Sequence, residues 1–310
     1  MRKTLIPRRR FLVTTALAAA ANGIRPAQVR AADRPALSFG VVADPQYADV
    51  APAGTRHYRQ SVAKLTEAVA HFNERDLAFA VNLGDLIDRD WASFDAILEP
   101  LARCQHRFHH VLGNHDFDVA DADKARVPAR LGRAERHGVF ELGAWSFVVL
   151  DTNDVSLYAH PENTPAHTDA RAAYERFAAT GAPNAQTWNG AVGERQLEWF
   201  EATCRAAAQA GRRVIVMAHH PVHPEDAHNV WNSRQLLAVL SRHRNVVAWL
   251  NGHNHAGAFD VFDGVPCLTF RGMVETEQSN AYAVVLLYPD RMEVVGHGRE
   301  PSRTLPFRSG

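Results

Sequence analysis

Five short apolar runs along this chain each end at a polar side chain that can bind a metal ion. The runs are 39–42, 79–83, 108–112, 214–218 and 246–250, and β-branched or aromatic residues dominate them. Such runs are typical of buried strands. The polar residues that follow them are Asp44 and Gln46, Asp85, Asn114, His219, and His253 with His255. Because the carboxyl ends of parallel strands gather at one edge of a sheet, we expect these side chains to form one site.

The segments between these runs have helical periodicity, at 57–73, 91–103, 194–210 and 233–243. Strand, helix and strand in this order predict βαβ units in a mixed α/β (α+β) fold. Nearer the C-terminus, short alternating runs at 258–262, 265–271, 281–288 and 292–297 are separated by hairpin signals. The second half of the chain is therefore predicted to supply a mostly antiparallel sheet.

Two polar stretches, 117–138 and 153–190, contain several prolines and no sustained period. Loops of this length in a compact domain are usually functional or disordered. Both follow segments that lead toward the expected site, so we interpret them as insertions that face the substrate.

The N-terminus has the pattern of an export signal. Arg8-Arg9-Arg10-Phe11-Leu12 precedes the apolar run 11–21, and this arrangement resembles the bacterial twin-arginine signal. The competing interpretation is a membrane anchor, but the run is shorter than the roughly 20 residues that span a bilayer. Cleavage after residue 31 would leave no stable membrane insertion. The resemblance implies the twin-arginine export machinery as a partner and a periplasmic or secreted protein.

Charge argues against a general nucleic-acid binder. The chain has 34 basic and 34 acidic residues, and seven of the basic ones lie within residues 1–31, which contain no acid. The remainder has 27 basic against 34 acidic residues, whereas affinity for a phosphate backbone needs a basic face. The three cysteines, Cys104, Cys204 and Cys267, fit no zinc motif and are expected to be buried.

The polar residues at the strand ends can be divided between two metal ions. Asp85 directly follows Gly84, so its carboxylate can approach two cations closely and bridge them. One ion would then bind Asp44, Gln46 and His255, and the other Asn114, His219 and His253. Two cations about 3.5–4 Å apart stabilise both the attacking and the leaving oxygen in a displacement at phosphorus.

The neighbouring residues suggest further roles. His219 and His220 point apart at a strand end, so normally only one ligates, and we favour His219. His115 is not needed as a ligand, and its expected task is to donate a proton to the leaving oxygen. Asp88 is expected to orient the His115 imidazole, with Asp116 as the competing candidate. For both aspartates the alternative is a charge at a helix N-terminus.

The motifs Asp44-x-Gln46, Gly84-Asp85-x-x-Asp88, Gly113-Asn114-His115-Asp116, His219-His220-Pro221 and Gly252-His253-Asn254-His255 together resemble the calcineurin-like metallophosphoesterases. The resemblance implies a four-layer αββα sandwich of two mixed sheets flanked by helices, with a dimetal site at the strand C-terminal ends. It would cover a catalytic domain at 36–301, followed by a C-terminal tail at 302–310. Gln46 stands where the common family pattern has histidine, and its harder oxygen ligand favours Mn²⁺ or Mg²⁺ over Zn²⁺ or Fe.

Further residues resemble one subgroup, the manganese-dependent ADP-ribose/CDP-alcohol diphosphatases. They are the segment 39–49, Tyr58-Arg59, Asn189-Gly190, Trp231-Asn232 and Val274-Glu275-Thr276. This likeness implies attack of a metal-activated hydroxide on a nucleoside diphosphate linked to an alcohol or sugar. The products would be a nucleoside monophosphate and a phosphorylated partner. One alternative is a phosphodiesterase or phosphomonoesterase of broad specificity, whose substrates include cyclic nucleotides. The other is a catalytically silent metal-binding protein.

Substrate contacts are predicted from residue type alone. An exposed aromatic near the metals would stack on a base, and the candidates are Tyr47, Phe117, Trp188 and Trp231. Arg89 and Arg271 could bind the second phosphate with two hydrogen bonds each. For every one of these residues a packing role is the alternative.

Overall fold

The structure is a computed structural model that describes residues 34–308. The predicted export signal falls on residues 1–31 and so lies outside the described residues. Within 34–308, none of the helices has both the length and the apolar character to cross a membrane.

The first of two six-stranded sheets has the strand order β12-β11-β10-β1-β2-β3. The central strands β1, β2 and β3 are parallel, whereas β10, β11 and β12 each run antiparallel to their neighbours. The strand bounds are β1 Leu37–Val42, β2 Phe79–Asn82, β3 Phe108–His110, β10 Ala281–Leu287, β11 Arg291–Gly298 and β12 Arg303–Pro306.

The second sheet has the order β4-β5-β6-β7-β9-β8. Here β5, β6, β7 and β9 are parallel, and the edge strands β4 and β8 are antiparallel. The bounds are β4 Gly138–Leu142, β5 Trp145–Val149, β6 Arg213–Met217, β7 Val246–Asn251, β8 Ala258–Phe262 and β9 Val265–Thr269.

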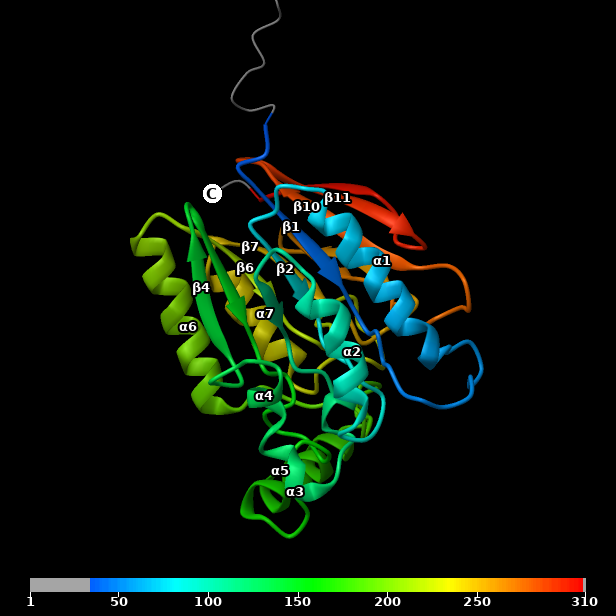
Figure 1. Cartoon of the computed structure of the whole chain (residues 1–310). Coiled ribbons are helices and arrows are strands. Elements are labelled where there is room, and N and C mark those ends of the chain that lie inside the picture. The colour runs from blue at the N-terminus through cyan, green and yellow to red at the C-terminus, as the bar shows by residue number, and fades with distance from the viewer. Residues whose placement is uncertain (1–33, 309–310) are drawn as a thin grey trace, which may run out of the picture.

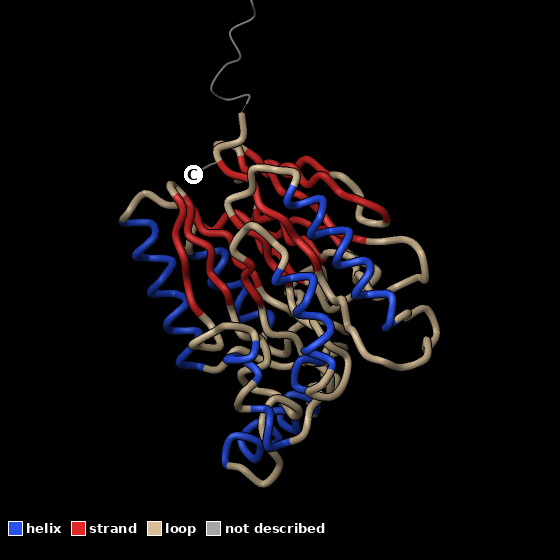
Figure 2. The backbone as a smooth tube through the Cα atoms, in the orientation of Figure 1, coloured by secondary structure: helices blue, strands red, loops and turns tan. Residues whose placement is uncertain are grey.

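Helices cover the outer face of each sheet, which produces the predicted four-layer sandwich (Figures 1 and 2). The helices α1 (Ser61–Asn73) and α2 (Ser93–Ala102) pack on the first sheet, and a short 3₁₀ turn, Tyr58–Gln60, precedes α1. The helices α6 (Glu194–Gln209) and α7 (Ser233–Arg242) pack on the second sheet.

The largest apolar cluster lies between the two sheets. Its centre is aromatic, because Phe39 stacks on Phe79 with ring centroids 4.7 Å apart, and Phe147 from the second sheet meets Phe79 edge-on at 4.9 Å. Successive side chains of β6 point to opposite faces of the second sheet. Ile215 and Met217 point to this central cluster, while Val214 and Val216 point to α6 and α7.

The C-terminal strands differ from the prediction of one mostly antiparallel sheet. The hairpin β8-β9 joins the second sheet, where β9 is parallel to β7, and β10 to β12 join the first sheet. Residues 302–310, predicted as a tail, include the edge strand β12, and Leu305 and Phe307 are buried in the central cluster. Hairpin signals specify local pairs, and they carry no information about which sheet a pair extends.

The two polar stretches lie at the end of the molecule where the parallel strands of both sheets end (Figure 1). The first contains the short helices α3 (Asp121–Lys124) and α4 (Val127–Arg130). The second contains α5 (Pro165–Ala178), whose first turn is capped by the Thr164 hydroxyl. The sequence did not indicate α5 because this helix buries only His167 and Ala170 and so has almost no apolar stripe.

Candidate metal centre

The seven predicted ligands come together at the ends of five strands. The Nε2 atom of His219 lies 2.9 Å from Asn114 Oδ1, 3.2 Å from His253 Nδ1 and 3.3 Å from Asp85 Oδ2. Gln46 donates to Asp85 Oδ2 at 3.0 Å, and His255 Nε2 lies 3.7 Å from Asp44 Oδ1. The ligand atoms of Asp44, Asp85 and His219 lie within 4.8 Å of one another.

Each imidazole is oriented by a partner at its other nitrogen. His219 Nδ1 donates to the Leu83 carbonyl at 2.9 Å, which leaves Nε2 free to bind a metal. His253 Nε2 donates to Asn189 Oδ1 at 2.8 Å, and His255 Nδ1 donates to Glu275 Oε1 at 2.8 Å. Such outer hydrogen bonds are typical of metal-ligating histidines.

The donor set fits divalent cations. Gln46 Oε1 is buried and has no hydrogen-bond partner among the described residues, so a metal would satisfy an oxygen that is otherwise costly to bury. A bound metal would also be a common partner for His219 Nε2 and His253 Nδ1, which lie 3.2 Å apart. Two carboxylates, two amide oxygens and three imidazoles form a mixed oxygen and nitrogen set that suits Mn²⁺.

Burial and charge shift the pKa values of these groups. Burial raises the pKa of Asp44. Burial acts in the same direction on Asp85, but the nearby His219 and His115 imidazoles outweigh it and lower the pKa of Asp85. Burial lowers the pKa of His219, whereas Asp85 raises it, and the net value is about 9. Metal binding would therefore displace a proton from His219.

Four of the ligand residues have left-handed backbone conformations, which are rare for residues other than glycine. The φ angles are 50° at Asp44, 44° at Gln46, 55° at Asp85 and 71° at His253. Each such residue costs roughly 1–3 kcal/mol and persists only where the surrounding structure fixes it.

Glycines let the backbone segments approach one another at the site. A Cβ atom on Gly113 would lie 2.1 Å from Asp85 Oδ1, and one on Gly84 would lie 2.3 Å from His219 Nδ1. Gly84 also has a φ of 107°. These contacts explain physically why glycine precedes Asp85 and Asn114 in the two motifs.

Of the two aspartates considered as partners of His115, Asp88 is the one in contact. Asp88 Oδ1 lies 3.2 Å from His115 Nδ1. The buried Asp116 carboxylate instead accepts hydrogen bonds from the backbone N–H groups of Gly113 and Leu86, both at 2.8 Å. Asp116 therefore joins the loops after β2 and β3, while Asp88 orients the imidazole.

His219 and His220 are both buried, but only His219 faces the carboxylates. The ring nitrogens of His220 lie 2.7 Å from Thr152 Oγ1 and 3.4 Å from the Trp188 carbonyl. Burial lowers the pKa of His220 well below its usual value, so this imidazole is neutral. His220 also belongs to a buried group with His219 and His253 that could hold a metal.

A pocket of about 370 Å³ lies beside the ligands. Trp188 lines it with 44% of its surface exposed, so an aromatic face is available next to the metal site. Arg56 and His228 also line this pocket. Neither residue was predicted from the sequence, because each lies in an irregular segment outside any motif. The full lining is Gln46, Arg56, Asp85, Asn114, His115, Trp188, His228, His253 and His255.

Two predicted substrate contacts are wrong because their side chains are buried. Phe117 is 1% exposed, and Trp231 is 4% exposed with its indole N–H bonded to the Gln186 carbonyl. Neither ring lines the pocket beside the ligands, so neither can stack on a base there. A position beside a motif does not reveal which way a side chain points.

The other three predicted contacts do not line the pocket. Tyr47 packs against the cluster under α1 and α2. The Arg271 guanidinium donates to the Arg299 carbonyl at 2.8 Å. Arg89 donates to Asp88 Oδ2 from two nitrogens, at 2.7 and 2.9 Å, and so supports the residue that orients His115.

A two-sheet sandwich with carboxylate, amide and imidazole ligands at its strand ends defines a class of metal-dependent phosphoester hydrolases. The sequence model described as calcineurin-like phosphoesterase matches residues 37–257, and the chain belongs to this family. The protein is therefore a phosphoester hydrolase that binds divalent metal ions.

Known relatives are similar over nearly their whole length. The manganese-dependent ADP-ribose/CDP-alcohol diphosphatase of Xenopus tropicalis is 30% identical over 89% of this chain and 96% of its own. The protein of the same name from Arabidopsis thaliana is 28% identical, over 88% and 97%. The crystal structure of a dimetal phosphatase from Danio rerio superposes with a TM-score of 0.79 at 28% identity, covering 88% of this chain and 100% of that one.

Proposed function

We propose that this protein hydrolyses the diphosphate link of nucleoside diphosphates joined to a sugar or small alcohol, of the ADP-ribose or CDP-alcohol type. The products would be a nucleoside monophosphate and a phosphorylated partner. The observation that carries the proposal is the exposed face of Trp188 in the same pocket as the ligand set. An aromatic face there suits a base, and relatives of similar length bear names of this activity.

The protein residues would bind and orient the substrate around two cations. The ligands are Asp44, Gln46, Asp85, Asn114, His219, His253 and His255. When bound, the two ions would supply positive charge to the phosphate oxygens and lower the pKa of a coordinated water. His115 lines the pocket and is oriented by Asp88, so its imidazole would donate a proton to the leaving oxygen.

The pocket residues that are not ligands would recognise the rest of the substrate. Trp188 would stack on the base. Arg56 lies at the pocket wall with its Nε 4.0 Å from Glu275 Oε1, and its guanidinium would bind the second phosphate. His228 also lines the pocket and would contact the substrate beside His253.

We propose Mn²⁺ as the physiological metal, with Mg²⁺, Fe and Zn²⁺ as competitors. The support is Gln46, because its unpaired amide oxygen is a harder ligand than imidazole. The relatives named above are manganese-dependent by name.

A substrate panel tests the proposed activity. With Mn²⁺, we expect kcat/KM for ADP-ribose and CDP-choline to exceed that for p-nitrophenyl phosphate and cyclic AMP by at least about a hundredfold. Comparable values for all four would favour a broad phosphodiesterase or phosphomonoesterase. No turnover of any of them by fully metal-loaded protein would favour a metal-binding protein without catalysis.

We also propose export through the twin-arginine machinery to the periplasm or exterior. The support is the sequence Arg8-Arg9-Arg10-Phe11-Leu12. Replacing Arg8 and Arg9 by lysine should retain the protein in the cytoplasm, as measured by cell fractionation. Unchanged fractionation of this variant would refute the proposal.

A further inference from the structure

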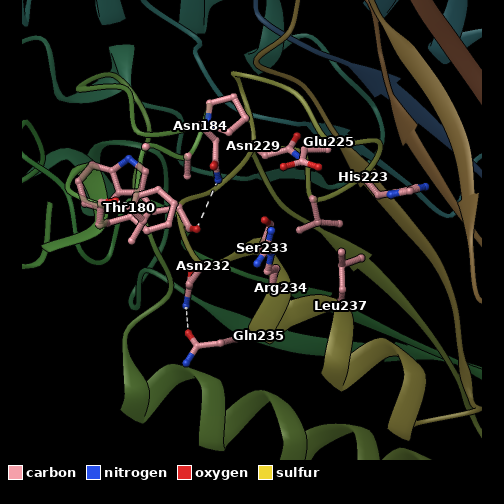
Figure 3. Close-up of a pocket in the computed structure, with 16 residues that line it drawn as sticks. Thr180, Asn184, His223, Glu225, Asn229, Asn232, Ser233, Arg234, Gln235 and Leu237 are labelled. Carbon is pink, nitrogen blue, oxygen red and sulfur yellow. Dashed lines mark hydrogen bonds between the residues drawn. The ribbon is translucent and has the colours of Figure 1, made fainter.

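A second pocket, larger than the metal pocket, lies on the other side of the segment 226–232. Its volume is about 770 Å³, and it lies between the C-terminal end of α5 and the first turn of α7 (Figure 3). One part of its wall is apolar, with Phe177, Val222, Trp231 and Leu237. The adjacent residues His228 and Asn229 line different cavities: His228 the metal pocket and Asn229 this one.

The first turn of α7 presents positive charge to this pocket. Ser233, Arg234 and Gln235 line it, and no acidic residue lies in that turn. The side chain of the N-cap residue Asn232 makes no capping hydrogen bond, because it is bonded to the backbone of Val192 and to Gln235. Arg234 forms no ion pair within the described part of the chain. The backbone N–H groups of Ser233 and Gln235 already donate to the Val230 and Asn232 carbonyls, so the Arg234 N–H is the donor of this turn that has no acceptor among residues 34–308. This N–H, the helix dipole and the Arg234 guanidinium all favour an anion.

A second observation points independently to a ligand. Asn229 lines the pocket, is 2% exposed and donates its Nδ2 to the Pro224 carbonyl at 2.9 Å. Its Oδ1 atom is buried and has no partner among residues 34–308. A buried acceptor without a donor costs about 1–3 kcal/mol, so a ligand N–H or O–H group would stabilise it.

We propose that this pocket binds a small aromatic organic anion. The anionic group would lie at the first turn of α7 beside Arg234, and the ring would pack on the apolar wall with Phe177 and Leu237. A hydrogen-bond donor on the ring would bind Asn229 Oδ1. The chemical groups of this ligand are inferred from the residues of the second pocket alone. The proposal therefore does not depend on the proposed diphosphatase activity.

AMP is a suitable probe because it carries a phosphate, an aromatic ring and an exocyclic amine. Calorimetric titration of AMP should be made into the full chain after removal of metals with a chelator, so that turnover is not the readout. We expect one binding site. Adenosine and inorganic phosphate should each bind at least about tenfold more weakly than AMP, since each lacks one of the two contacts.

Substitutions locate the site. Arg234→Gln should weaken AMP binding by about tenfold through loss of a charge-assisted hydrogen bond. The matched control is Arg171→Gln, an exposed arginine of α5 that does not line the pocket, and it should leave the affinity unchanged. Ala182→Trp should weaken binding by placing an indole ring inside the pocket, and Glu225→Gln should strengthen it by removing a charge of the same sign as the ligand.

A variant in the metal pocket separates the two cavities. Trp188→Ala, which removes the ring proposed to stack on a base in the metal pocket, should leave the affinity of the metal-free protein for AMP unchanged. Absence of AMP binding to the metal-free protein would overturn the proposal. So would binding that Arg234→Gln and Ala182→Trp leave unaffected while both variants melt at the wild-type temperature.

Discussion

Asp85 occupies the centre of the site at the scale of single residues. Its Oδ1 accepts the His115 backbone N–H at 2.8 Å, and its Oδ2 contacts both Gln46 and His219. One carboxylate thus connects the two expected ligand groups. Asp85 could be predicted as a ligand from the sequence, because glycine followed by aspartate at the end of a strand indicates a carboxylate that can approach metal ions closely. The directions of Phe117 and Trp231 depend on packing that no local pattern records.

Asp85→Asn should abolish turnover and weaken the loading of both metals. The amide keeps the shape but loses the negative charge that two bound cations would share. We expect kcat to fall at least about a thousandfold and metal content, measured by mass spectrometry, to fall for both ions. Loss of a single equivalent would show that Asp85 does not bridge.

Gln46→His should shift the metal preference toward zinc or iron. Imidazole is a softer ligand than an amide oxygen, and Gln46 Oε1 is the unpaired atom at this position. Competition between Mn²⁺ and Zn²⁺ during reconstitution measures the ratio bound. An unchanged ratio would mean that Gln46 is not a ligand, and wild-type protein provides the reference.

His115→Ala should lower kcat by about 10²–10⁴-fold, because the leaving oxygen would lose its proposed proton donor. Metal content should be unchanged, since His115 belongs to neither ligand group. Asp88→Asn should cause a smaller loss, because it only disturbs the orientation of the imidazole. Full turnover by His115→Ala would contradict the assigned role.

At the scale of elements, the strands that carry ligands could be predicted and the order of the sheets could not. Strong apolar runs such as β6 and β7 are recognisable as strands in the sequence. Because βαβ units place consecutive parallel strands side by side, the pairing of these two strands could also be predicted. In contrast, β12 has one buried apolar residue, Leu305, which is too weak a signal to distinguish a strand from a tail. The placement of β10 beside β1 is a contact between distant segments that periodicity does not encode.

Deleting residues 302–310 should therefore destabilise the protein. The truncation removes Leu305 and Phe307 from the cluster between the sheets and exposes the edge of β11. Burial of two such side chains contributes about 3–6 kcal/mol. Chemical denaturation should show a loss of this size. An unaffected midpoint would mean that β12 is not part of the stable fold.

At the scale of the whole molecule, buried histidines make the fold sensitive to acid. Burial, with Arg133 and His109, lowers the pKa of His110 to about 3. The unfolded chain binds a proton near the ordinary histidine pKa of about 6.5, so between these values it holds more protons than the folded chain. The contribution of neutral His110 to the free energy of unfolding is therefore complete above about pH 7 and is lost progressively as the pH falls below about 6.5.

The free energy of unfolding of the wild-type protein should fall by about 2 kcal/mol more than that of His110→Phe between pH 7 and pH 5. Denaturant titration of both proteins at each pH measures the difference. Comparing the change with pH, rather than the absolute values, removes the effect of the substitution on packing. An equal fall in both proteins would show that His110 does not contribute.

The left-handed backbone at Asp44, Gln46, Asp85 and His253 also limits how this catalyst can diversify. A replacement there must supply a donor atom and, at the same time, tolerate a main-chain geometry that β-branched side chains reject. Random libraries at these positions should return mainly asparagine, aspartate, histidine and glycine among folded clones. New specificities would then arise from the walls around Trp188 and Arg56, where no such double restriction applies.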